Sequence, residues 1–345
     1  MKKFNFPAAA LICLVFTACQ KQMSDSTNTL LTPSQTTASI ITMPTPAFVW
    51  WTHPTDLPMP DDFYIGWELG LGFAINGKGY TFCGRLNSIQ HTTLHLPSLW
   101  EYDPATRIWT PKADFPGPAD IKNCSFVIGS TLYVCAYNTC WAWDQTTNTW
   151  TAKASFPSHR RLNSSAFAIN GKGYVGLGVD VDVNTYPYMK DWWEYDPVAD
   201  SWSRKKDFPG GAREYAPAFA VGNYGYICGG MKATSGEDLW RYDPSTDTWL
   251  QKTTPPTTGL AGGIGLSGVV NGGTPTGFVV QGISHGCLEY TPATDKWGIL
   301  PDVPGASARY NAAGFMIGRS LYVAGGVGPT TSQFHKDVQA LNWSK

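Results

Sequence analysis

The sequence predicts an all-β fold in which six four-stranded sheets are arranged radially, as the blades of a six-bladed β-propeller. Two spacings recur five times: an aromatic residue precedes a Trp by seven residues, and that Trp precedes a Pro by seven. A Gly-containing hairpin lies upstream of each aromatic pair. The last repeat lacks one strand, and a matching strand is found near the start of the chain. Self-similarity at a regular interval is the signature of repeat architectures.

The aromatic pairs mark the two outer strands of each sheet. They are Tyr102/Trp109, Trp143/Trp150, Tyr195/Trp202, Tyr242/Trp249 and Tyr290/Trp297. The prolines that follow are Pro116, Pro157, Pro209, Pro256 and Pro304. In the first repeat, Trp100 and Tyr102 are two residues apart and therefore share one face of a strand. The Asp103-Pro104 that follows ends this strand, because proline has no N–H for the ladder.

The two inner strands are predicted from a hairpin with a Gly-containing turn. Residues 73–80 read Phe-Ala-Ile-Asn-Gly-Lys-Gly-Tyr, and residues 167–174 repeat these letters. Apolar runs on either side of such a turn are typical of paired strands. Small residues follow, as in Cys83-Gly84, Gly229-Gly230, Gly282 and Gly325-Gly326. A four-stranded sheet cannot bury its aromatic face alone, so it stacks against copies of itself.

The glycine pair, the Tyr of the third strand and the spaced Trp resemble kelch repeats, and the resemblance covers residues 47–345. Three repeats depart from the pattern: Cys83-Gly84 and Cys135-Ala136 stand where two glycines are expected, and Thr291 replaces the Asp. The resemblance implies a propeller whose ligands meet the loops that enter the innermost strands, around the central channel.

The two ends of the chain predict the number of blades. The last repeat runs through Tyr322 and Leu341 and stops at Lys345 without its Trp strand. Near the other end, Trp51 precedes Pro58 by seven residues. We therefore expect the N-terminal strand to complete the sixth blade, which closes the ring and removes its open edges.

The N-terminus predicts export. Lys2 and Lys3 precede a short apolar run, so residues 1–18 are typical of a signal peptide. The residues up to Cys19 resemble a lipobox, which implies lipidation of Cys19; simple secretion is the alternative. Gln20 after the Cys favours the outer membrane by analogy with sorted lipoproteins. Residues 19–46 are rich in Ser, Thr, Gln and Pro and predict a flexible tether.

The charge of the chain excludes one class of partner. The formal net charge is −1 and the sequence has no basic stripe, so a nucleic-acid partner is not expected. Membrane attachment is expected through the lipid anchor alone. The expected partner is a glycan or a protein at the cell envelope, and no cofactor is expected.

Six cysteines remain once Cys13 and Cys19 are set aside, and their spacing indicates no disulfide framework. We expect most to be small buried residues. For one pair, a disulfide is the alternative to two buried free thiols. If Gly129-Ser130 is a two-residue turn, Cys124 faces Cys135 across the hairpin, which would allow a cross-strand disulfide there.

The candidate ligand-binding residues lie in the loops that enter the innermost strands. Aligning three repeats on Phe167, Phe219 and Phe315 places an Arg six residues earlier each time. The full set is Arg161, Arg213, Arg309, Asn163, Tyr215, Tyr310, Asn311 and Trp67, with Glu68, Lys122 and Asn123 near by. Converging guanidiniums would hold carboxylates, and aromatic rings would stack on sugars. The alternative is that each Arg pairs with a carboxylate or carbonyl of a neighbouring blade.

A catalytic hypothesis is also open. The fold and export signal are similar to those of kelch-type sialic-acid epimerase, which implies an acid and an Arg in the channel, here Glu214 beside Arg213. That family has long insertions which these even repeats lack, and fold analogy alone is a weak argument for chemistry. We therefore expect a binding module, with a sugar epimerase or mutarotase and a purely structural scaffold as alternatives.

Other motifs in the sequence do not predict a site, because they lie in the wrong structural context. Residues 171–176 and 263–268 both match GxGxxG, but each lies within a repeat and opens no helix, so dinucleotide binding is rejected. His91 and His95 have the spacing of a helical metal pair but lie in an insertion, so no metal site is expected. No copper-oxidase or Ser-His-Asp site can be matched to the remaining residues.

Overall fold

The structure is a computed structural model. It describes residues 49–52, 56–57, 64–68, 70–88, 93–118, 124–232, 237–270, 273–280, 282, 286–303, 309–328 and 335–343. The predicted signal peptide, Cys19 and the tether (1–46) lie outside the described residues. All described elements are β-strands. In this part of the chain we find no helix with the length and apolarity needed to cross a bilayer.

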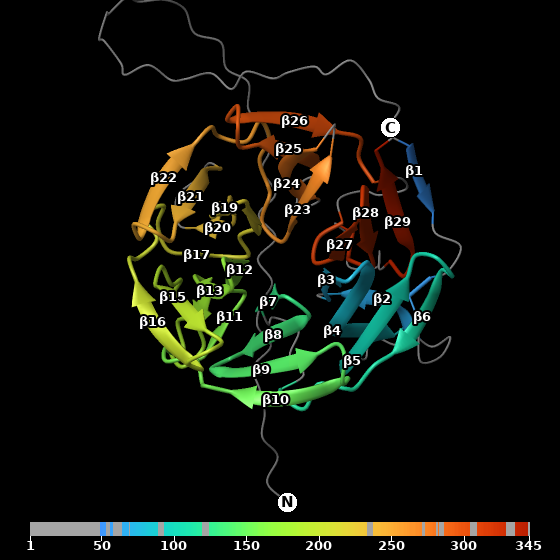
Figure 1. The fold of residues 1–345 in the computed structure, drawn as a ribbon, viewed down its shortest axis with the longest axis horizontal. Helices are drawn as coiled ribbons and strands as arrows, with labels where there is room; N and C mark the ends of the chain where they lie inside the picture. Colours follow the sequence, from blue (N-terminus) through green and yellow to red (C-terminus); the bar gives the residue numbers. More distant parts are fainter. Residues whose placement is uncertain are drawn as a thin grey trace, which may run out of the picture. The chain divides into compact units, whose positions relative to one another are not determined.

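Six sheets of four or five strands surround a central axis, as the sequence predicts (Figure 1). The first blade contains β3 (Leu71–Ile75), β4 (Lys78–Ser88), β5 (Thr93–Asp103) and β6 (Ile108–Pro111), with β2 (Tyr64–Glu68) added to β4. The second contains β7 (Cys124–Ile128), β8 (Thr131–Ala136), β9 (Thr139–Asp144) and β10 (Thr149–Lys153). The third contains β12 (Ser165–Ile169), β13 (Lys172–Gly176), β15 (Trp192–Asp196) and β16 (Ser201–Lys205).

The remaining blades follow the same plan. The fourth contains β18 (Ala218–Val221), β19 (Tyr224–Cys228), β21 (Leu239–Asp243) and β22 (Thr248–Lys252). The fifth contains β23 (Ile264–Val270), β24 (Thr274–Val280), β25 (Cys287–Thr291) and β26 (Lys296–Leu300). The sixth contains β27 (Ala313–Ile317), β28 (Ser320–Ala324), β29 (Val338–Asn342) and β1 (Val49–Thr52). The first strand in each of these blades contacts its counterparts in neighbouring blades around the axis.

The sixth blade is assembled from both ends of the chain. β1 pairs antiparallel with β29, and Trp51 lies opposite Ala340. The order of this sheet is β1-β29-β28-β27, so the first strand of the chain is its outer edge. The predicted closure by the N-terminal strand is confirmed.

Aromatic residues fill the space between blades. Tyr195 of the third blade and Tyr133 of the second have ring centroids 5.5 Å apart. The same contact, at 5.4 Å, joins Tyr242 to Tyr174 one blade further on. Tyr195 and Tyr242 are fully buried. The repeated Tyr therefore packs against the blade before its own, which is why one sheet alone cannot bury it.

In four blades the repeated Trp joins the outer strand to the preceding blade by a hydrogen bond. The indole N–H of Trp202 donates to the carbonyl of Ala154 at 2.9 Å. Trp150, Trp249 and Trp297 make the same bond to Ala113, Lys206 and Thr253. The fixed spacing between aromatic residues thus places an indole donor at four of the junctions between blades, whereas the Trp109 indole nitrogen has no hydrogen-bond partner among the described residues.

In four blades, a glycine in the second strand allows the backbone to lie directly against an aromatic ring of the preceding blade. A Cβ on Gly173 would overlap the ring of Phe126 from the preceding blade. Gly79, Gly225 and Gly277 lie in the same way under Phe315, Phe167 and Phe219. Backbone and ring touch directly, so any side chain at these positions would separate the two blades.

The cysteines are free and buried in the described part of the chain, namely Cys124, Cys135, Cys140, Cys228 and Cys287. Cys124 does lie opposite Cys135, so the predicted hairpin register is confirmed. The two are not bonded: the Cys124 thiol instead lies 3.9 Å from the Cys135 carbonyl oxygen. The side chain of Cys83 is outside the described residues.

Candidate ligand-binding site at the mouth of the channel

The three arginines predicted to face the mouth are buried beneath it. Arg161, Arg213 and Arg309 are 3%, 0% and 1% exposed. Arg161 donates from both terminal nitrogens to Asp191, at 2.9 and 2.6 Å. It also donates to the carbonyl of Leu177 at 3.1 Å. A guanidinium held in this way is engaged by its own blade.

The same arrangement recurs in two further blades. Arg213 donates to the two carboxylate oxygens of Asp238 at 2.5 and 2.9 Å. Arg309 donates to both oxygens of Asp337 at 3.0 Å. In each case the Asp is the residue just before the third strand of the same blade, and not of a neighbouring blade as the alternative interpretation supposed. These arginines therefore act as struts that fix the entry loop to its own sheet.

The arginines lower the pKa of the aspartates that they contact. Burial alone would raise the pKa of Asp191 and Asp238, but the hydrogen bonds and positive charge of Arg161 and Arg213 outweigh it, so both pKa values fall below the ordinary range. The fifth blade lacks the pair: Leu260 and Gly286 occupy the two positions. Because both members change together there, the pair behaves as one structural unit.

Two residues after each Arg, the chain turns into the left-handed region. Asn163, Tyr215 and Asn311 have φ of 58°, 54° and 55°. Gly262 occupies the same place in the fifth blade, with φ of 71°. The N–H of Tyr215 donates to the carbonyl of Asn163 at 3.1 Å. Gly262 donates to Tyr215, and Asn311 to Gly262, each at 3.0 Å. A chain of backbone hydrogen bonds therefore runs from blade to blade around four of the six blades.

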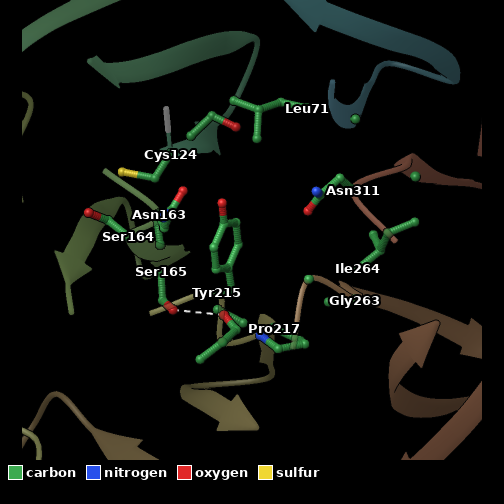
Figure 2. A pocket seen from close by; sticks show the side chains of 18 of the residues that line it. Leu71, Cys124, Asn163, Ser164, Ser165, Tyr215, Pro217, Gly263, Ile264 and Asn311 are labelled. Carbon is green, nitrogen blue, oxygen red and sulfur yellow. Dashed lines mark hydrogen bonds between the residues drawn. The ribbon is translucent and has the colours of Figure 1, made fainter. Parts of the chain in front are cut away.

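This turn directs side chains toward the axis. Figure 2 shows Asn163, Tyr215 and Asn311 pointing toward one another across the opening. They line a cavity of about 210 Å³ with the backbone of the innermost strands. The described residues that line it are neutral, with polar groups from Asn163, Ser164, Ser165, Tyr215 and Asn311.

Asn163 has an unsatisfied acceptor at this mouth. The side chain is 7% exposed. Its Nδ2 donates to the Glu214 carboxylate. Its Oδ1 has no hydrogen-bond partner among the described residues. A buried carbonyl oxygen without a donor costs about 1–3 kcal/mol, and a hydroxyl or amide of a bound molecule would supply that donor.

A second cavity of about 650 Å³ adjoins the first, and Asn163 and Tyr215 line both. Its other walls are Tyr186, Pro187 and Tyr188, from the loop between β14 (Val179–Asp180) and β15, and Glu214 on β17 (Arg213–Glu214). Tyr186 is 60% exposed. Burial and the nearby Glu214 carboxylate raise the pKa of the Tyr188 hydroxyl. The cleft thus combines aromatic faces with one carboxylate.

Some of the remaining predicted residues line the two cavities, and others lie elsewhere or outside the described residues. Asn163, Tyr215 and Asn311 come together at the mouth, and Glu214 faces the adjoining cleft. Tyr310 bridges to Val327 and lines neither cavity. Trp67 and Glu68 lie on β2, but their side chains, like Lys122 and Asn123, are outside the described residues. Arg213 reaches Asp238 and not the cleft, so it does not stand beside Glu214 as a catalytic partner.

The sequence interpretation missed Tyr186 and Tyr188. Both belong to an insertion that is longer in the third blade than the turn Tyr137–Asn138 at the same place in the second. Next to that insertion, the side chains of His159, Asp180 and Asp182 lie close together. Among the described residues, they are the one group of three whose ligand atoms are near enough to share a metal ion. These groups already pair internally, with His159 Nδ1 3.2 Å from Asp180 and Arg160 3.8 Å from Asp182.

Comparison with known proteins agrees with this architecture. The Kelch motif matches residues 212–256, which include all four strands of the fourth blade. No curated protein sequence matches the chain. Among solved structures, the chain is similar to that titled "Structure of YjhT", with a TM-score of 0.64 and 17% identity over 83% of this chain and 95% of that one. The chain is a six-bladed β-propeller of the kelch type.

Proposed function

We propose that the protein is a binding module that takes a neutral saccharide at the mouth of the propeller, in the cavity lined by Asn163, Tyr215 and Asn311 and the adjoining cleft. The fold and the cavities support a kelch propeller with a polar mouth. The saccharide is inferred from the chemistry of the walls.

The observation that carries the proposal is the free acceptor of Asn163. Its Oδ1 is buried, lacks a partner and belongs to a side chain that lines both cavities. Carboxamides and hydroxyls are the groups that bind sugar hydroxyls, since each can donate or accept. The Glu214 carboxylate fixes the orientation of the carboxamide, because it accepts from Nδ2 and so leaves Oδ1 for the ligand.

Two further features favour a neutral sugar. The exposed ring of Tyr186 and the half-buried ring of Tyr188 offer aromatic faces beside these polar groups. The guanidiniums of Arg161, Arg213 and Arg309, which would bind an acidic sugar, are engaged with aspartates. A protein ligand is the competing occupant, and a scaffold with no ligand is the third hypothesis.

A glycan array followed by calorimetric titration of the best saccharide tests the proposal. We expect saturable binding and a loss of at least tenfold in affinity for Asn163→Gly, which removes the carboxamide and suits the left-handed backbone. The matched control is Asn170→Gly, because Asn170 is exposed in a hairpin turn with φ of 50°. Equal affinity in the two variants, or no saccharide binding by the folded protein, would refute the proposal.

A sugar mutarotase is the second candidate, and Glu214 is the observation in its favour. Its carboxylate lines a cleft large enough for a monosaccharide and lies close enough to Tyr188 to raise the pKa of that hydroxyl. A carboxylate so placed can exchange a proton with an anomeric hydroxyl. Anomer exchange of neutral sugars and sialic acid, followed by NMR, should be accelerated by the protein and lost in Glu214→Gln. A binder shows no acceleration.

We further propose that the protein acts at the cell envelope, anchored to the outer membrane through lipid on Cys19. The support is the Phe16-Thr17-Ala18-Cys19 stretch after a basic and apolar segment. Labelling cells with a palmitate analogue should mark the wild type and not Cys19→Ser. Recovery of unlabelled wild-type protein from the medium would favour simple secretion.

A further inference from the structure

Three cysteines form one row across the second blade. Cys124 on β7 lies opposite Cys135 on β8, and Cys135 lies opposite Cys140 on β9. All three are at most 5% exposed. In the other blades, the two positions equivalent to Cys135 and Cys140 contain at most one Cys among the described residues.

The two gaps in this row differ. The sulfur atoms of Cys135 and Cys140 are 3.1 Å apart. Cys124 instead directs its sulfur toward the backbone carbonyl of Cys135, at 3.9 Å, and lines the mouth cavity. A disulfide requires about 2.05 Å between sulfurs, so a closure of about 1 Å joins Cys135 to Cys140.

The backbone around this pair is suited to a cross-link. β8 and β9 are joined by the two-residue turn Tyr137–Asn138, and Ala136 lies opposite Thr139 at the turn. In such a hairpin, the closing pair exchanges backbone hydrogen bonds and the next pair outward does not. Residues of a non-hydrogen-bonded pair have Cα atoms about 4.5 Å apart, within the range of about 4.4–6.8 Å that disulfides span.

The second blade has a different residue at this place. In the third, fourth and sixth blades an Asp before the third strand accepts hydrogen bonds from an Arg, whereas Asn138 precedes the third strand here. The turn nevertheless supports the mouth, because Tyr137 bridges to Arg161 and Asn138 accepts from the Phe156 N–H at 2.8 Å. A covalent bond across β8 and β9 would fix this turn.

We propose that Cys135 and Cys140 form a disulfide in the mature protein and that Cys124 remains a free thiol at the mouth. This role does not depend on the identity of the ligand. The oxidant is an external disulfide, met while the chain is still open, since the folded blade encloses all three sulfurs. One thiolate attacks the external disulfide and releases one thiol. The second thiolate then displaces the other, so the protein pair is oxidised and the external disulfide becomes two thiols.

Peptide mapping tests the pairing. Protein exported by its own N-terminal segment is denatured with N-ethylmaleimide, digested with chymotrypsin without reductant and analysed by mass spectrometry. Cleavage after Tyr137 separates Cys135 from Cys140, so their disulfide appears as two linked peptides. We expect that linkage, with Cys124, Cys228 and Cys287 alkylated.

Two cysteine variants and oxidative refolding test the same linkage independently. Cys124→Ser should retain the linkage, whereas Cys140→Ser should leave Cys135 alkylated. Reduced, unfolded protein refolded with oxidised glutathione should form the same bond. A Cys124–Cys135 linkage, or alkylation of both Cys135 and Cys140 in the exported and the refolded protein, would overturn the proposal.

Discussion

Trp51, on the first strand of the chain, lies opposite Ala340 on the last, and Ala340 lies opposite Tyr322 on the strand before it. The N-terminal strand is therefore the outer edge of a blade whose other three strands come from the C-terminus. Without it, the sixth blade has three strands and its outer edge is unpaired.

Removal of this strand should destabilise the ring. A deletion of residues 1–58 should lower the midpoint of thermal unfolding of the whole propeller relative to the protein without its predicted tether, residues 1–46. Circular dichroism of the two proteins measures the difference. Equal midpoints would mean that closure by β1 contributes nothing.

Gly173 should be intolerant of a side chain. Gly173→Ala places a methyl group against the ring of Phe126, and overpacking of this kind costs about 1–3 kcal/mol. Denaturant unfolding measures the loss. A double-mutant cycle with Phe126→Ala is the control: the Ala at 173 should cost much less once the ring is absent. An additive cycle would place the strain elsewhere.

The Arg213–Asp238 strut should fail when one partner is removed and be partly recovered when both are. Asp238→Gly alone leaves a buried guanidinium without its carboxylate, at a cost of about 3–5 kcal/mol. The double variant Arg213→Leu/Asp238→Gly copies the residues of the fifth blade, Leu260 and Gly286, and should be more stable than the single variant. Equilibrium unfolding compares the two. A double variant that is less stable would contradict the strut.

Glu289 should make stability depend on pH. It is buried, and its Oε2 has no hydrogen-bond partner among the described residues. Phe278 and Leu300 replace the Tyr174 and Lys205 that bind the equivalent Glu194 in the third blade. Burial raises the pKa of Glu289. The folded protein therefore holds this proton at pH values where the unfolded chain, with a pKa of about 4.3, has lost it.

The free energy of unfolding should consequently fall as the pH rises from about 4.3 to the raised pKa. Unfolding of Glu289→Gln across this range should show a smaller decline than the wild type. Glu194→Gln is the matched control: it should lose stability through its Tyr174 and Lys205 partners and keep the decline. Parallel curves for the wild type and Glu289→Gln would assign the pH dependence to other groups.

The fold was predictable because its determinants are spacings. The indole of Trp202 must reach Ala154, and the Tyr195 hydroxyl must reach Asp200, which it does at 2.5 Å. Such contacts fix the distance along the chain between aromatic residues. The closing strand followed in the same way, since Trp51 keeps the spacing to Pro58.

The site was only partly predictable. The alignment found the loop that carries Asn163, Tyr215 and Asn311, but took the neighbouring arginines for ligand groups. Their partners lie far along the chain, as Asp191 does from Arg161, so spacing within one loop could not reveal the pair. The sequence did contain a signal for this pair. An Asp precedes the third strand in the blades that have the Arg, and the fifth blade has neither the Arg nor the Asp.

A crystal structure of the protein with its bound saccharide would show directly whether the mouth of the propeller is the binding site. We expect a sugar hydroxyl within hydrogen-bond distance of Asn163 Oδ1, with the ring against Tyr186 or Tyr188 and Arg161 still paired with Asp191. A saccharide seated on the outer strands, or at the opposite end of the channel with Asn163 uncontacted, would contradict it.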